Sequence, residues 1–126
     1  MSMRTPLGRV RGHGSARAGT GHFWWQRVTS VALIPLTIAV LIIIFSLLGR
    51  NHAAVIRILG SPLVAIIMLL FIGTTAYHMK LGMQVIIEDY VHDEIPKLLL
   101  LMGNVFFSIA VGMAGVYAVL KISFGV

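Results

Sequence analysis

Three long apolar stretches dominate this 126-residue chain and limit what it can fold into. They run from about residue 28 to 48, from about 62 to 87 and from about 98 to 120. About 20 apolar helical residues cover the hydrocarbon core of a bilayer, and each stretch is at least that long. Because 58% of the residues are hydrophobic and only 11% are charged, the chain lacks the polar surface of a soluble domain. The sequence therefore predicts an all-α membrane protein with three transmembrane helices.

Local signals refine the predicted spans. Pro35 lies inside the first span and is expected to kink it. Residues 53–60 are predicted to form a short helix at the membrane interface, followed by Ser61 as an N-cap and Pro62 as the first residue of the second span. In the third span, small residues repeat every four positions, which either permits close helix contact or simply reflects their frequency in membrane helices. These residues are Ala110, Ala114 and Ala118, and also Ser108 and Gly112.

Charged residues are segregated along the chain. Five of the ten basic residues precede the first span, and all four acidic residues lie in a predicted loop from Glu88 to Glu94. Because basic residues flank membrane helices mainly on the cytoplasmic side, we expect a cytoplasmic N-terminus, a cytoplasmic acidic loop and an external C-terminus. Residues 1–21 are predicted to be a mobile basic tail and residues 22–126 the membrane domain. The pI is near 10.6, but basic residues beside membrane spans indicate contact with lipid headgroups and not with nucleic acid.

The second span is less purely apolar than the others and carries His78 in its interior. At about 1.5 Å per residue, His78 lies about 24 Å from Pro62, on the cytoplasmic side of the bilayer centre. A neutral imidazole there can ligate a haem iron, bond to another helix or take part in a proton relay. The residue types leave all three alternatives open. The chain has no cysteine, which excludes thiolate ligands and c-type haem attachment.

Other candidate residues lie near His78 at helical spacing. Gly82 shares its stripe and is expected to leave room for a flat macrocycle beside the imidazole. Asp89 returns to nearly the same face at about 100° per residue. Asp89 either marks the water boundary or has a functional role. Tyr90 either anchors the helix at the interface or donates a hydrogen bond to a quinone.

The start of the first span combines aromatic and basic residues. Trp24 and Trp25 form an aromatic belt that is typical of a membrane–water interface. Arg27 follows them and can bind a lipid phosphate or a haem propionate. Lys80, inside the second span, is expected to extend its ammonium group toward the cytoplasmic surface.

The segment HMKLGMQVIIEDY, residues 78–90, resembles the signature of the family of succinate dehydrogenase hydrophobic membrane anchors. In that family a histidine precedes a Gly-Met pair and then an Asp-Tyr pair at the helix end. The residues that match this order and spacing are His78, Gly82, Met83, Asp89 and Tyr90. The string WQRVTS, residues 25–30, also resembles the start of the family's first helix. The resemblance covers about residues 21 to 120.

The resemblance implies a non-catalytic anchor of succinate:ubiquinone oxidoreductase in the bacterial inner membrane, within the respiratory chain and the tricarboxylic acid cycle. His78 would be one axial ligand of a b-type haem, and a second membrane anchor, of cytochrome b type, would supply the other. Tyr90 and Asp89 would form part of the ubiquinone site, with Arg27 near the quinone or a propionate. Iron–sulfur and flavoprotein subunits would dock on the anchor, since this chain has no flavin or cluster motif. Alternatives are a fumarate reductase anchor, a small transporter or proton relay, and an assembly protein without cofactor.

Overall fold

The computed structural model describes residue 3, residues 5–7 and residues 16–125. From residue 16 onward the chain forms α2 (Ala16–Leu47), α3 (His52–Leu59), α4 (Pro62–Tyr90) and α5 (Glu94–Phe124). No strand occurs among the described residues, and α2, α4 and α5 are each long and apolar enough to cross a membrane. The prediction of an all-α protein with three spans is therefore confirmed.

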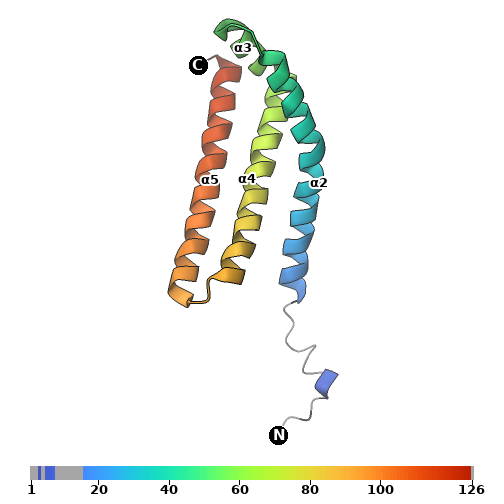
Figure 1. The fold of residues 1–126 in the computed structure, drawn as a ribbon, viewed down its shortest axis with the longest axis vertical. Coiled ribbons are helices and arrows are strands. Elements are labelled where there is room, and N and C mark those ends of the chain that lie inside the picture. The colour runs from blue at the N-terminus through green and yellow to red at the C-terminus, as the bar shows by residue number, and fades with distance from the viewer. Residues whose placement is uncertain (1–2, 4, 8–15, 126) are drawn as a thin grey trace.

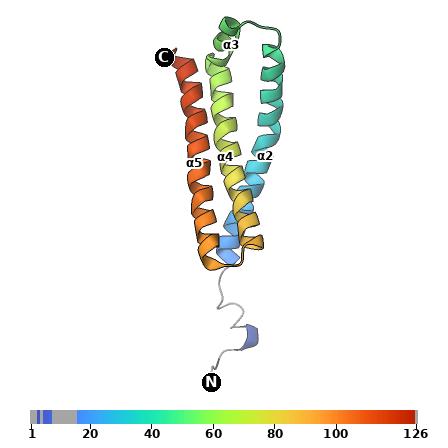
Figure 2. The ribbon, with the colours of Figure 1, turned by 60° about the vertical axis from the view of Figure 1, so that its left-hand side comes forward.

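The three long helices form a single row with α4 in the middle (Figures 1 and 2). α2 and α5 each pack against α4, and within the described part of the chain α2 and α5 make no close backbone contact with each other. The connection from α4 to α5 lies at the same end as the first turns of α2, whereas α3 lies at the opposite end. Pro35 lies inside α2, which curves along its length in Figure 1. The central position of α4 means that its side chains are contacted from two sides.

Short-range contacts explain how the chain turns between the spans. Gly49 has φ of 74°, a left-handed conformation that favours glycine, and it follows the last turn of α2. Asn51 is the N-cap of α3, and its side chain accepts a hydrogen bond from the backbone N–H of Ala54 at 2.9 Å. Ser61 and Pro62 occupy the predicted N-cap and first position of α4, although the Ser61 hydroxyl bonds back to a carbonyl of α3. The short helix predicted for residues 53–60 is thereby confirmed.

The helix ends differ from the sequence-based boundaries. α2 begins at Ala16, within the predicted tail of residues 1–21, most of which lies outside the described residues. The prediction of a loop from Glu88 to Glu94 is wrong, because α4 continues to Tyr90 and residues 91–93 alone connect it to α5. Hydropathy marks where the apolar core of the bilayer ends, but a helix satisfies its own backbone groups and can continue into the headgroup region.

Small residues set the contact between α4 and α5. A Cβ atom at Gly112 would lie 3.4 Å from the Cβ of Ala76, and one at Gly115 would lie 2.7 Å from a methyl carbon of Ile72. Ser108, one turn before Gly112, is 5% exposed. The predicted contact row is therefore confirmed for Ser108 and Gly112. Ala110, Ala114 and Ala118 are exposed in this chain, which favours for them the alternative that small residues are frequent in membrane helices.

Candidate functional site

His78 extends from α4 toward α2, where its ring contacts Thr29. The His78 Nδ1 atom lies 2.8 Å from Thr29 Oγ1, and the pair joins positions 49 residues apart in the sequence. Thr29 is 6% exposed, and its hydroxyl oxygen also lies 2.8 Å from the carbonyl oxygen of Trp25 and 3.1 Å from that of Gln26. A threonine inside a helix commonly donates its O–H to such a carbonyl one turn earlier. Thr29 therefore has both a carbonyl acceptor and an imidazole partner.

The second ring nitrogen of His78, Nε2, has no hydrogen-bond partner among the described residues. Because the hydroxyl hydrogen of Thr29 can go to a carbonyl, its oxygen can accept from Nδ1–H. That tautomer leaves the Nε2 lone pair free to bind a metal or to accept a proton. Hydrogen bonding to another helix, one of the alternatives drawn from sequence, is thus present and leaves the ring able to act as a ligand.

A row of polar side chains on α2 lies beside this pair. His22, Gln26 and Thr29 are separated by four and three residues, so they share one face of the helix. The His22 Nε2 and Gln26 Oε1 atoms are buried, and neither has a hydrogen-bond partner in the described part of the chain. Buried polar atoms without partners cost free energy in an apolar setting. This end of the α2–α4 contact therefore has hydrogen-bonding capacity that the chain does not itself use.

Gly82 faces the same row from α4. A Cβ atom at Gly82 would lie 3.8 Å from Gln26 Nε2, which is an ordinary van der Waals distance. The sequence predicted open space there, and the structure instead places the Gln26 side chain against it. Sequence reasoning assigned no role to Gln26 or Thr29. The available signal was the helical spacing of three polar residues at the start of an apolar span.

Arg27 lies on a different side of α2 from Thr29. Two residues separate them, which is about 200° around a helix. Arg27 is exposed, and its guanidinium carbon lies 4.7 Å from the ring centroid of Phe23. The structure therefore does not bring Arg27 together with His78 within this chain.

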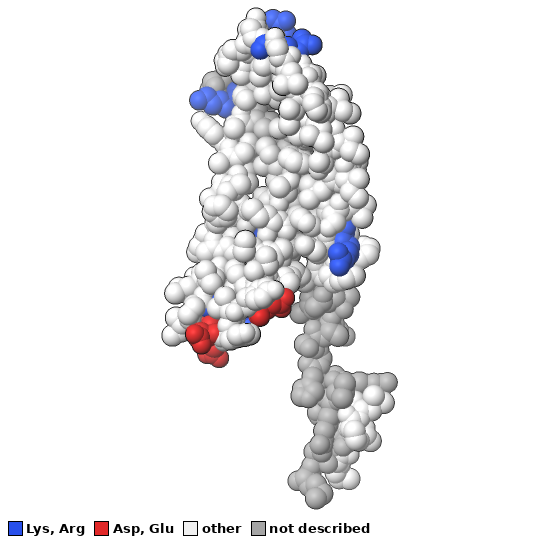
Figure 3. Space-filling view, in the orientation of Figure 1, with Lys and Arg blue, Asp and Glu red and all other residues white. Residues whose placement is uncertain are grey.

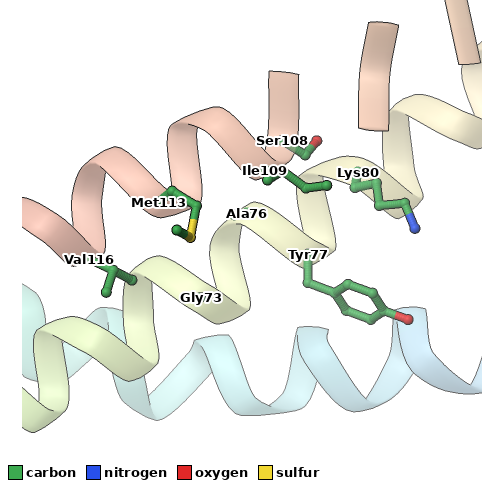
Figure 4. A pocket seen from close by; sticks show the side chains of 9 residues that line it. Gly73, Ala76, Tyr77, Lys80, Ser108, Ile109, Met113 and Val116 are labelled. Carbon is green, nitrogen blue, oxygen red and sulfur yellow. The ribbon is translucent and has the colours of Figure 1, made fainter. Parts of the chain in front are cut away.

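An aromatic contact fixes α2 against α4 beside the histidine. The rings of Trp25 and Tyr77 meet edge to face, with centroids 6.2 Å apart. Lys80 Nζ lies 5.7 Å from the Tyr77 ring centroid, and Figure 4 shows both side chains extending from α4. Both contacts flank His78 in sequence, and the Trp25–Tyr77 contact joins α4 to α2 beside it.

On its other side, α4 is held by α5. Asn104 is 8% exposed and donates from Nδ2 to the carbonyl oxygen of Lys80 at 2.9 Å. The two helices also form an open pocket of about 280 Å³ whose walls include Tyr77, Lys80 and Ser108 (Figure 4). α4 is thus fixed from both sides within two residues of His78.

Asp89 and Tyr90 form the end of α4, and both side chains are exposed. Tyr90, at 79% exposed, lines a groove of about 480 Å³ between the end of α4 and the start of α5. The groove is mostly apolar, and its walls also include Met83 and Phe107. His78 and Tyr90 are twelve residues apart, or about 120° around the helix, so His78 faces α2 while Tyr90 faces the α5 side. The structure therefore keeps these two predicted site residues apart within this chain.

Comparison with known proteins shows which family the chain belongs to. The model of a family described as the succinate dehydrogenase/fumarate reductase transmembrane subunit matches residues 1–116. The chain belongs to this family. The matched region contains every predicted site residue, from Arg27 to Tyr90. No solved structure matches the chain significantly.

Curated relatives are described as membrane anchor subunits of succinate dehydrogenase. The succinate dehydrogenase hydrophobic membrane anchor subunit of Rickettsia bellii is 33% identical over 118 residues, which are 92% of this chain and 93% of the relative. That of Rickettsia conorii is 34% identical over 86 residues, 66% of this chain and 67% of the relative. The succinate dehydrogenase membrane anchor subunit of Reclinomonas americana is 31% identical over 81 residues, 62% of this chain and 68% of the relative.

Membership of the succinate dehydrogenase/fumarate reductase family confirms the resemblance stated from sequence. Together with the three apolar helices, it makes the chain a multi-pass inner-membrane anchor subunit of succinate dehydrogenase. It favours the anchor interpretation over a transporter or a cofactor-free assembly protein.

Proposed function

We propose that this anchor subunit supplies one axial ligand of a b-type haem and part of a ubiquinone-reduction site in a succinate:ubiquinone oxidoreductase. The observation that carries the proposal is the orientation of His78, whose ring lies inside the helix pair with Nδ1 hydrogen-bonded and Nε2 without a partner. A second membrane anchor, of cytochrome b type, would supply the other iron ligand. The iron–sulfur and flavoprotein subunits dock at the membrane face nearest Tyr90.

The residues present fit a haem. A ligating histidine normally donates its second N–H to an acceptor, which fixes the tautomer and the ring orientation. Thr29 Oγ1 lies at hydrogen-bond distance from Nδ1 for that purpose. The buried, unpartnered His22 Nε2 and Gln26 Oε1 atoms provide further polar groups near the ligand. His78 would hold the iron through Nε2, and the bound haem would supply one-electron redox chemistry.

The quinone part of the proposal rests on the last turn of α4. A quinone has a polar head and an apolar tail, and the groove beside Tyr90 is apolar with a phenol hydroxyl at its rim. Tyr90 donates its O–H to a quinone carbonyl, and the neighbouring Asp89 carboxyl passes protons from water, since reduction to the quinol consumes two electrons and two protons. Arg27, exposed on α2, contributes positive charge near the quinone or a haem propionate when the second anchor is in place.

Substitution of His78 tests the haem part of the proposal. The His78→Ala complex, purified with its partner subunits, is expected to lose the reduced-minus-oxidised absorbance of a b-type haem that the wild-type complex shows. His52→Ala is the matched control, because His52 is exposed in α3, at the end of the bundle opposite the α4–α5 connection. A full haem complement in the His78→Ala complex, or a wild-type complex without haem, contradicts the proposal.

A further inference from the structure

We propose that Thr29 is the positioning residue for His78, and that its hydroxyl oxygen accepts the Nδ1–H bond that holds the imidazole ready for ligation. The inference rests on the proposed haem-ligand function of His78. Its basis is a single contact between two helices, the 2.8 Å distance from Thr29 Oγ1 to His78 Nδ1. No other described side chain hydrogen-bonds to the His78 ring.

The neighbours of Thr29 allow its oxygen to accept this hydrogen bond. A hydroxyl group has one hydrogen to donate and two lone pairs that accept. The Thr29 hydrogen has two backbone acceptors in its own helix, at 2.8 Å on Trp25 and 3.1 Å on Gln26. Its oxygen can therefore accept from Nδ1 without losing its own donor bond. The opposite direction would place the proton on Nε2 and block ligation.

Thr29 is also a rigid acceptor. It is β-branched, it lies on a helix and it is 6% exposed, so its side chain has few accessible rotamers. The bond to the Trp25 carbonyl further fixes the position of Oγ1. A fixed acceptor sets both the tautomer and the rotation of the imidazole about its Cβ–Cγ bond. Thr29 thus acts on the iron through His78 and does not touch it.

The contact has an expected electronic effect. A hydrogen bond from Nδ1–H makes the opposite nitrogen more basic, and a more basic ligand favours ferric over ferrous iron. Removing the acceptor should weaken haem binding and raise the midpoint potential. Loss of a residue that orients a metal ligand commonly costs about 10-fold in affinity. If only ferric haem loses affinity, a 10-fold loss raises the one-electron midpoint potential by about 59 mV.

Three variants of the complete complex test the role of the hydroxyl. Thr29→Val keeps the shape and removes the hydroxyl, Thr29→Ser keeps the hydroxyl and removes a methyl group, and Ser30→Ala is the matched control. Ser30 donates to the Gln26 carbonyl at 2.7 Å and is not hydrogen-bonded to His78. Thr29→Val is expected to show a raised midpoint potential and an altered low-spin electron paramagnetic resonance signal, whereas Thr29→Ser and Ser30→Ala stay near wild type.

Other patterns overturn the inference. If Thr29→Val has the wild-type potential and spectrum, or if Thr29→Ser is the more damaged variant, the hydroxyl does not position the ligand. Assembly in cells that make no haem separates positioning from a purely structural role. If Thr29 only positions the ligand, the Thr29→Val chain should assemble there with its partners as well as the wild-type chain does. An equal assembly loss with and without haem contradicts positioning, even if too little haem remains for spectroscopy. Absence of haem from the wild-type complex, or its retention in His78→Ala, would instead contradict the proposed function.

Discussion

The polar contact between His78 and Thr29 is too weak to be a main source of stability. Hydrogen bonds between membrane helices contribute about 0.6 kcal/mol on average, with a maximum near ~1.7 kcal/mol. Packing of α2 and α5 on α4 involves many more atoms than this one pair. We therefore expect the contact to act through orientation, because an acceptor beside Nδ1 favours one rotation and one tautomer of the imidazole.

Tyr90 offers a clean test of the quinone site. Tyr90→Phe removes one hydroxyl from a side chain that is 79% exposed, so the fold and assembly of the complex should be unchanged. Quinone reduction by succinate is expected to fall by about 10-fold to 100-fold, because a donor to the developing charge on the quinone oxygen is lost. Succinate oxidation with an artificial acceptor that bypasses the membrane subunits is the control and should stay at the wild-type rate. Equal loss in both assays would show that Tyr90 supports docking instead.

Residue type and spacing were sufficient to single out His78, Asp89 and Tyr90. A histidine inside an apolar span and an Asp-Tyr pair at its end are unusual enough to be noticed in one sequence. Thr29 and Gln26 could not be paired with the histidine in this way. The span in α2 is apolar nearly all round, so its sequence does not determine which face meets α4. That rotation is fixed only when the helices pack.

At the scale of the elements, close approach of α5 to α4 depends on glycine. Gly115 faces Ile72, where a Cβ atom would lie 2.7 Å from a methyl carbon. Real Cβ atoms do not approach so closely, so the Ile72 side chain or the helix would have to move. This contact lies toward the α3 end of the bundle, whereas Asn104 joins the same two helices nearer His78.

Gly115→Ala is therefore expected to destabilise the α4–α5 contact. Overpacking costs about 1–3 kcal/mol, which outweighs a helix-propensity gain of about 0.5–1 kcal/mol. Gly73→Ala in α4 is the control, because nothing lies within 4 Å of a Cβ atom there, and it should be neutral or stabilising. Thermal inactivation of the purified complex in detergent measures both. Equal behaviour of the two variants would show that the helices are not in contact at Gly115.

The sequence predicted the number and order of the spans but not their ends. Apolar length determines that a segment crosses the bilayer, and all three predictions of this kind are confirmed. Three of the four acidic residues of the predicted loop lie in helices, since Glu88 and Asp89 continue α4 and Glu94 starts α5. Helix ends depend on caps and on headgroup-level contacts, which hydropathy does not report.

At the scale of the whole molecule, charge is divided between the two ends of the bundle (Figure 3). The acidic residues lie at the end where α4 joins α5, together with the start of α2. Arg50, Arg57 and Lys121 belong to the opposite end, near α3. Topology follows the balance of basic residues in flanking segments, while acidic residues contribute little. Five basic residues precede the first span, whereas three lie at the opposite end. This excess favours a cytoplasmic position for the acidic end.

The absence of cysteine from the chain makes this orientation directly testable. His92 lies exposed between α4 and α5, and Ala53 lies exposed in α3, so a single cysteine at either position should leave the packing intact. A membrane-impermeant thiol reagent is expected to label His92→Cys only in inverted vesicles and Ala53→Cys only from the outer face of intact spheroplasts. Wild-type chain, which has no thiol, is the control in both preparations. The reverse pattern would place Tyr90 on the outer face, away from the cytoplasmic subunits that the quinone proposal requires. Labelling of both positions from the same side would show that α4 does not cross the membrane.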